Sequence, residues 1–289
     1  MLRKLTPYLL VAPMIGFIAV FTYIPILTSL DLSFHDWDFL SSHRPFVGFK
    51  NYELILNSHE FWNALRVTAI FTAISVPLRL ALALIIASFL VRETAAARIL
   101  RGAFFLPAVT STVSIAVVFS WVFSTDYGMA NNLLQSVGLA KVQWLQTPWL
   151  ALAALIVVNT WKQLGYDIII YIAALQAVPS ELYDAAAVDG GKKLHVFRRV
   201  TFPLVMPTTY FLLVVSVIEA FQIFTIVDVM TNGGPAGGTT MLVTLLYRIG
   251  FNLFDIGQGS ALAVMLFVLL VILAFVKSKI LGQKVHYAS

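Results

Sequence analysis

The sequence lacks cysteine altogether and has few charged residues. Without cysteine, the chain can form neither a disulfide nor a thiolate metal site, and it has no cysteine nucleophile. Asp, Glu, Lys and Arg make up only 11% of the chain, against about a quarter in a typical soluble domain. Hydrophobic residues reach 60% and the mean hydropathy is +0.88. A soluble protein of 289 residues with this composition would have no polar coat. We therefore predict an integral membrane protein surrounded by lipid.

Motifs for chemistry are also missing. The sequence contains no GxxxxGK[ST] loop and no His-Glu-x-x-His helix, the usual signatures of a phosphate-binding loop and of a catalytic zinc site. Its five histidines fall in predicted loops or tails. We therefore predict that the chain is not itself an enzyme and binds no cofactor or metal.

Apolar runs of the length needed to cross a bilayer, about 20 residues, recur along the chain. We expect six membrane-spanning helices, at roughly 8–30, 64–91, 103–124, 149–176, 201–228 and 257–280. The first could instead be a cleaved signal peptide, because Arg3 and Lys4 precede it. However, it is too long for the apolar region of such a peptide, and no small-x-small cleavage pattern follows it. The composition thus predicts an all-α, polytopic membrane protein.

The loops between these spans differ in their content of Lys and Arg, which sets orientation in a membrane. If the N-terminus is cytoplasmic, the cytoplasmic side receives Arg3, Lys4, Arg92, Arg98, Arg101, Lys192, Lys193, Arg198, Arg199, Lys277, Lys279 and Lys284. The other side receives only Arg44, Lys50, Arg66, Lys141 and Arg248. This bias predicts that both termini are cytoplasmic. It also explains the net charge of +5 as topological, so we expect no nucleic-acid partner.

The loop after the fourth predicted span has the composition of two short helices. Ser180 can cap a helix over Glu181–Val188, Asp189-Gly190-Gly191 permits a sharp turn, and Lys192–Val200 can form a second amphipathic helix. Such a segment could lie on lipid headgroups as an interfacial helix, or it could dock on a cytoplasmic partner. The residues alone leave both interpretations open.

Four stretches of the sequence resemble the carbohydrate-type permeases of binding-protein-dependent ABC importers, in the maltose and glycerol-phosphate branch. Asp184-Ala185-Ala186 followed by Gly190 resembles the EAA loop of that family, with Asp in place of the usual Glu and Gly191 in place of the usual Ala. The stretches 161–179, 231–251 and 46–52 are similar to the span before this loop, to the last external loop and to the segment after the first helix. The resemblance runs in order over nearly the whole chain.

The resemblance implies a type I ABC importer permease fold in a bacterial cytoplasmic membrane. The first helix and its external segment, 1–61, would precede a core permease domain, 62–285, with a coupling loop at about 177–203. The implied partners are a second homologous permease subunit, two ATPase subunits that bind the ATP and Mg²⁺, and an extracytoplasmic solute-binding protein. Transport would follow alternating access. The residues expected to couple to the ATPase are Glu181, Asp184, Ala185, Ala186, Asp189, Gly190 and Phe197.

Charged residues inside the predicted spans mark the candidate solute site, because charges at membrane depth usually face a cavity or each other. Lys162 and Glu219 are the foremost cases, and they could either contact the solute or form a buried ion pair between two helices. For Arg79 and Asp167 we expect partners on other helices or at the interface. The positions that match the solute site of the resembling permeases are Lys162, Gln163, Tyr166, Ser216, Ala220 and Ile223. Together with Glu219 and Gln222 they make up the predicted solute site.

The function expected from these residues is uptake of a sugar, glycoside or polyol. One alternative is a glycerol-3-phosphate or phosphodiester importer of the same family. A different class, an ion-coupled secondary transporter, could recruit Glu219 and Asp167 for a proton or sodium relay. The loop of two short helices distinguishes these classes, because a secondary transporter needs no ATPase dock.

Overall fold

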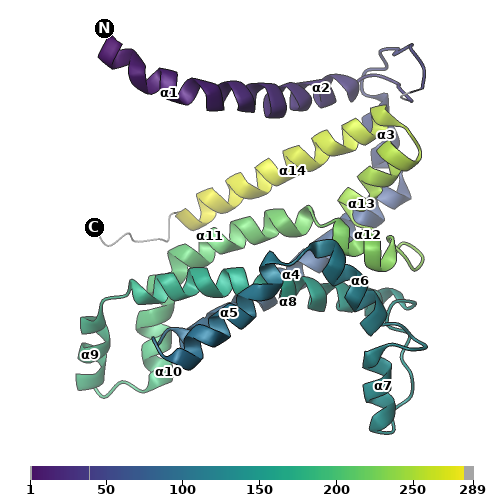
Figure 1. Ribbon diagram of the computed structural model, residues 1–289. Helices are drawn as coiled ribbons and strands as arrows, with labels where there is room; N and C mark the ends of the chain where they lie inside the picture. The colour runs from purple at the N-terminus through teal and green to yellow at the C-terminus, as the bar shows by residue number, and fades with distance from the viewer. Residues whose placement is uncertain (1, 39, 283–289) are drawn as a thin grey trace. The chain divides into compact units, whose positions relative to one another are not determined.

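The protein is helical almost throughout the part described by a computed structural model, residues 2–38 and 40–282 (Figure 1). In that part, the only β-type pairing outside helices is an isolated bridge between His35 and Phe46. The chain divides into two compact units, unit 1 (Met1–Trp62 and Leu245–Val271) and unit 2 (Asn63–Thr244 and Ile272–Ser289). The division into 1–61 and 62–285 that we expected from the sequence stays a prediction. Its end at 285 lies outside the described residues, and so does Lys284, which we counted among the cytoplasmic cations.

Unit 1 begins with a nearly continuous helix made of α1 (Leu2–Ile18), the π-helical turn η1 (Ala19–Tyr23) and α2 (Ile24–Leu32). The rest of unit 1 comprises α3 (Lys50–Asn57), the first residues of α4 (His59–Leu90), the end of α13 (Leu242–Tyr247), η3 (Arg248–Asn252) and most of α14 (Ile256–Gly282). The apolar stretch Leu10–Leu32 has no buried residues in its most hydrophobic window. A helix that is apolar all round and uncovered by protein is suited to lipid.

The segment that follows α2 in unit 1 is fastened by backbone and amide hydrogen bonds. Asn51 is buried, and its Nδ2 donates to the carbonyl oxygens of Ser33 and His35, at 2.9 Å each. The Ile256 N–H donates to the Trp37 carbonyl at 2.9 Å, which ties the same segment to the start of α14. This loop is therefore built on buried, satisfied polar groups.

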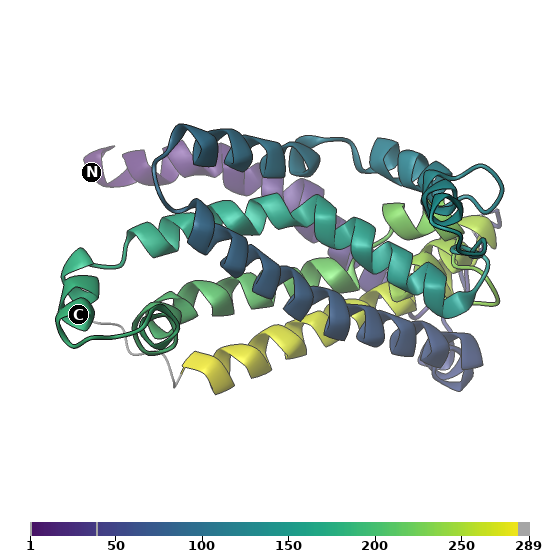
Figure 2. The ribbon, with the colours of Figure 1, turned by 90° about the horizontal axis from the view of Figure 1, so that it is seen from below.

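Unit 2 is organised around α8 (Pro148–Gln176), against which α5, α11 and α12 pack (Figure 2). The other elements that lie wholly in unit 2 are α5 (Ala95–Val109), α6 (Thr112–Val122), α7 (Met129–Ser136), α9 (Ser180–Val188), α10 (Lys193–Val196), η2 (Phe197–Thr201), α11 (Phe202–Phe221) and α12 (Thr225–Thr231). Unit 2 also contains most of α4, the first residues of α13 and the end of α14. Gly165 of α8 permits the approach to α5, because a Cβ there would overlap the carbonyl oxygen of Phe104.

The expected spans agree with the helices except at two places. Four helical stretches among the described residues are long and apolar enough to cross a membrane: Leu10–Leu32, His59–Leu90, Lys193–Phe221 and Ile256–Phe275. The pair α5 and α6 makes a fifth if it is one span. The helix expected at 149–176 is present as α8, but it is not among the stretches that meet this criterion of length and hydropathy, so its crossing of the membrane stays a prediction.

The straight helix expected at 103–124 is wrong. Helices α5 and α6 meet at an angle of 97°, because Thr110 and Ser111 adopt non-helical backbone conformations, with ψ of 147° and 129°. The expected span 201–228 is also wrong at its end, since α11 stops at Phe221 and α12 is a separate helix. Composition does not reveal either break, because apolar residues continue on both sides of it.

Candidate functional site

A cluster of charged side chains lies inside unit 2, where α4, α8 and α11 meet. Arg79 Nε is 2.7 Å from Asp167 Oδ2, and Arg79 Nη2 is 3.1 Å from Glu219 Oε2. Arg79 Nη2 also donates to the hydroxyl of Ser216. The Nε–H does not point along the line to Oδ2, so that contact is an ion pair without a hydrogen bond. The partners that we expected for Arg79 and Asp167 on other helices are thus present.

Exposure differs sharply within this cluster. The side chains of Arg79 and Asp167 are 4% and 1% exposed, whereas that of Glu219 is 40% exposed. Ser216 and Glu219 lie three residues apart on α11, and therefore on the same face of that helix. The formal charges of Arg79, Asp167 and Glu219 sum to −1. The cluster therefore has one accessible carboxylate, that of Glu219, which is paired with the buried guanidinium of Arg79.

The ion pair that we considered between Lys162 and Glu219 is wrong. Lys162 is buried, and its Nζ donates to the carbonyl oxygens of Ala108 at 3.3 Å and Thr110 at 3.4 Å. These carbonyls lie at the break between α5 and α6, where the helical hydrogen bonds stop. The C-terminal end of a helix carries partial negative charge and unpaired carbonyls, which a nearby cation stabilises. Because the sequence does not reveal the break, it could not reveal this partner.

The remaining predicted solute-site residues differ in accessibility. Tyr166 is 48% exposed and Gln222 is exposed, whereas Gln163 is half-buried. Ala220 and Ile223 are buried. The exposed members of the set are therefore Glu219, Tyr166 and Gln222. Gln222 is also the residue that follows the end of α11, and its N–H donates to the carbonyls of both Ile218 and Glu219. Whether this set contacts a solute stays a prediction.

The predicted coupling loop contains a well-defined helix terminus. Gly190 has a φ of +69°, its N–H donates to the Ala187 carbonyl at 3.1 Å, and the Gly191 N–H donates to the Ala186 carbonyl at 2.9 Å. These bonds form a Schellman motif, which needs a left-handed residue at the position of Gly190. Only the conformation requires glycine there, because nothing lies within 4 Å of a Cβ on Gly190.

Helix α9 has no buried residue, although Leu182 is 41% and Val188 is 88% exposed. Of the predicted coupling residues, Glu181, Asp184, Ala185 and Asp189 are exposed, and Ala186 and Phe197 are half-buried. Ser180 is the first residue of the helix rather than its side-chain cap, because Pro179 precedes it in the capping position. The second helix expected here, Lys192–Val200, is not a separate helix. Helix α10 continues through η2 into α11, so that Lys193–Phe221 is one helical stretch.

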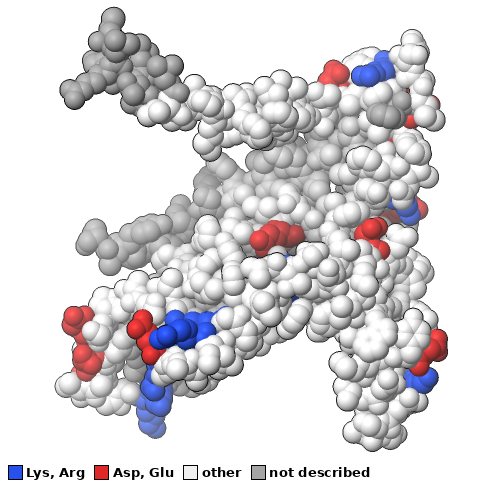
Figure 3. Space-filling model, viewed as in Figure 1, with Lys and Arg blue, Asp and Glu red and all other residues white. Residues whose placement is uncertain are grey.

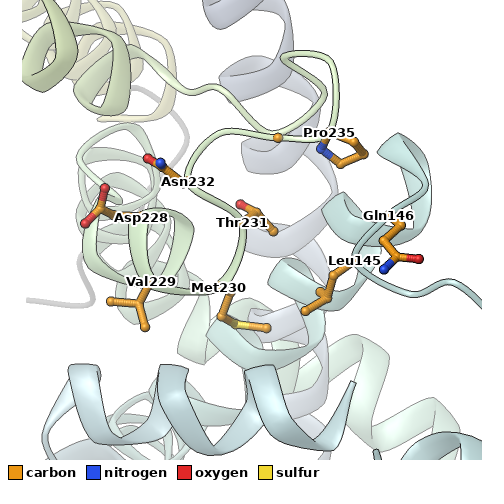
Figure 4. A pocket seen from close by; sticks show the side chains of 9 residues that line it. Leu145, Gln146, Asp228, Val229, Met230, Thr231, Asn232 and Pro235 are labelled. Atoms are coloured by element: carbon orange, nitrogen blue, oxygen red, sulfur yellow. The ribbon is translucent and has the colours of Figure 1, made fainter. Parts of the chain in front are cut away.

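A pocket of about 390 Å³ lies at the end of unit 2 opposite α9, beside the loop that contains Gly233-Gly234-Pro235 (Figure 4). Asp228 and Asn232 stand on one side of it, and Leu145 and Gln146 on the other. Sequence reasoning picked out this loop as a turn and through its resemblance to the carbohydrate-type permeases, but it did not predict the pocket. Amides and a carboxylate beside apolar side chains form a mixed polar surface at that end.

The helical fold described above agrees with comparisons to known proteins. A family model described as "Binding-protein-dependent transport system inner membrane component" matches residues 79–287. The chain belongs to this family. This binding-protein-dependent permease is 33% identical to the trehalose/maltose transport system permease protein MalF of Thermococcus litoralis, over 94% of this chain and 92% of that protein. It is 32% identical to the sn-glycerol-3-phosphate transport system permease protein UgpA of Agrobacterium fabrum, over 99% of this chain and 97% of that protein.

Solved structures show the same permease fold. A chain of a bacterial alginate ABC transporter, in complex with an alginate pentasaccharide-bound periplasmic protein, superposes with a TM-score of 0.85 at 22% identity, covering 96% of this chain and 94% of that one. A second structure of a bacterial alginate importer gives a TM-score of 0.83 at 25% identity, over 96% and 95% of the two chains. This chain is therefore a permease subunit of an ABC importer. The comparisons do not support the alternative of an ion-coupled secondary transporter.

Proposed function

We propose that this permease imports an uncharged, hydroxyl-rich solute, a sugar, glycoside or polyol, driven by ATP hydrolysis in two partner ATPase subunits. The pathway would form between this chain and a second homologous permease, and an extracytoplasmic binding protein would deliver the solute. ATP and Mg²⁺ would be bound by the ATPases. Both termini would face the cytoplasm, in agreement with the bias of Lys and Arg.

The observation that supports a neutral solute is the partly exposed carboxylate of Glu219. Arg79 is shared between Asp167 and Glu219, so the cluster keeps a net charge of −1, and its accessible group is the Glu219 carboxylate. At 4 Å and an effective dielectric constant of 20, two like charges repel by about 4 kcal/mol. A sugar hydroxyl instead donates to a carboxylate, which is favourable by about 1.5–3 kcal/mol. Lys162, which could have attracted a phosphate, is buried against backbone carbonyls.

The support for ATPase docking comes from α9. A helix with no buried residue, exposed Leu182 and Val188 and a fixed end at Gly190 offers a preformed surface to a partner. Grooves that accept helices use such apolar anchors. Because α9 and α10 join α8 to α11, movement of a bound ATPase would be transmitted to the helices that carry Asp167 and Glu219. The pocket of Asp228 and Asn232 would then face the binding protein on the other side of the membrane.

The test is uptake by reconstituted complexes with Glu219→Gln and Glu219→Leu, using the solute released from the purified binding protein. For a neutral solute, Glu219→Gln should reduce uptake only modestly, because it keeps an acceptor oxygen. Glu219→Leu should be far worse, because each desolvated hydroxyl without a partner costs about 1–3 kcal/mol. Glu53→Gln and Glu53→Leu, at an exposed acid of α3, are matched controls.

Two outcomes would contradict this proposal. Faster uptake by Glu219→Gln would indicate an anionic solute such as glycerol phosphate. Wild-type uptake by both Glu219 variants would place this carboxylate outside the solute pathway.

A further inference from the structure

Unit 2 contains a second pocket, of about 460 Å³, to which the proposed function assigns no ligand. It lies between the end of α4, the end of α8 and the segment from α9 to η2. Its lining residues are Ser88, Val91, Arg92, Leu175, Tyr183, Ala187, Gly191, Lys193, Val196, Phe197 and Thr201. Two of them are cations and none is an acid. At this end of unit 2, Figure 3 shows basic side chains near α10, with acidic side chains beside them.

The two cations of this pocket have no acidic partner. Among the described residues, no carboxylate lies within 4.0 Å of the side-chain nitrogens of Arg92 or Lys193. The backbone that carries Arg92 is nevertheless fixed. Arg101 donates through Nε and Nη2 to the Leu90 carbonyl, at 3.0 and 2.6 Å, and through Nη2 to the Arg92 carbonyl at 3.2 Å. Arg101 thus caps the end of α4 and leaves the guanidinium of Arg92 free for an anion.

The rest of the pocket combines hydroxyls with an apolar wall. Val91, Leu175, Val196 and Phe197 supply the apolar side chains. The Tyr183 hydroxyl lies 3.2 Å from Thr201 Oγ1, which links α9 to η2 across the pocket. A small soluble anion would use the cations but would gain nothing from the apolar wall. An amphiphile with an anionic head and a hydrocarbon chain would use both.

We propose that this pocket binds an anionic phospholipid, with its phosphate between Arg92 and Lys193 and its acyl chain along the apolar wall. The proposal rests on the orientation in the proposed function, which places this end of unit 2 at the cytoplasmic leaflet. Basic pockets between membrane helices on that side suit anionic headgroups. A lipid bound there would brace the α9 loop against the inner ends of α4 and α8, so lipid composition would regulate how firmly the docking helix is held.

The experiment uses the assembled importer in phosphatidylcholine nanodiscs with and without phosphatidylglycerol, and native mass spectrometry counts the retained phosphatidylglycerol. Arg92→Gln/Lys193→Gln should weaken its binding about 30-fold, which corresponds to ~1 kcal/mol for each lost cation. Ala187→Phe keeps both charges but fills the pocket, and it should weaken binding comparably. Arg98→Gln/Lys192→Gln removes two exposed cations from the same side outside the pocket, and it should bind as the wild type does.

The outcomes are distinct. If Ala187→Phe keeps the lipid and both charge pairs lose it equally, attraction to a diffuse basic surface explains the binding and the pocket proposal is wrong. If excess inorganic phosphate displaces phosphatidylglycerol completely, a soluble anion occupies the pocket and the lipid assignment is overturned. Because lipid retention is measured without transport, an error in the proposed solute does not change either result.

Discussion

Arg79 of α4 and Asp167 of α8 form an ion pair, with Nε and Oδ2 2.7 Å apart and both side chains at most 4% exposed. Removing one member of a buried pair costs more than removing both, because the remaining charge has no solvent and no partner. Glu219 shares the same guanidinium. The cluster therefore fastens three helices of unit 2 through a single cation.

The three charges of this cluster should differ in their effect on stability. Arg79→Met leaves two carboxylates without a partner, so we expect a loss of about 3–5 kcal/mol. Asp167→Leu should cost less, because Glu219 still balances Arg79. Glu219→Leu should cost least, because this carboxylate is partly solvated. Thermal unfolding of the purified complex measures the order. Adding Asp167→Asn to Arg79→Met should restore part of the loss, and equal midpoints for all variants would show that the cluster does not stabilise the fold.

Gly165 should tolerate no side chain, because a Cβ there overlaps the backbone of α5. We expect Gly165→Ala to force α5 and α8 apart and to cost at least about 1–3 kcal/mol, as overpacking does. Gly102 offers a matched control within α5, since nothing lies within 4 Å of its Cβ. Gly102→Ala should be neutral or stabilise the helix by up to about 1 kcal/mol. The yield and unfolding temperature of the complex in detergent give the comparison, and equal behaviour of the two variants would contradict the packing of α8 on α5.

Gly190 and Gly191 should be sensitive to substitution for different reasons. At Gly190 the left-handed conformation costs an ordinary residue about 1–2 kcal/mol, so Gly190→Val should loosen the end of α9 and uncouple uptake from ATP hydrolysis. Gly190→Asn should retain coupling, because Asn adopts this conformation readily. At Gly191 the limit is space, since a Cβ lies 2.8 Å from the Ala186 carbonyl oxygen. The number of solute molecules imported per ATP hydrolysed in proteoliposomes measures coupling. Full coupling in Gly190→Val would contradict a role for this helix end.

The sequence predicted the membrane helices well where a long apolar run coincides with one helix. It failed at Thr110 and at Gln222, where an apolar stretch contains a break. It also anticipated the fold family, through four stretches that resemble that family in order along the chain. It anticipated the turn at Gly190 as well, because a turn depends on residues that are neighbours in the chain.

What the sequence by itself determined is therefore local: the membrane as solvent, the approximate spans, a sharp turn at Gly190 and the presence of charges inside helices. Which charges meet was decided only by the tertiary structure. Arg79 and Glu219 are 140 residues apart, and Lys162 lies 52 residues from Thr110. Burial makes any partner for a charge favourable, and only helix packing selects which one is within reach.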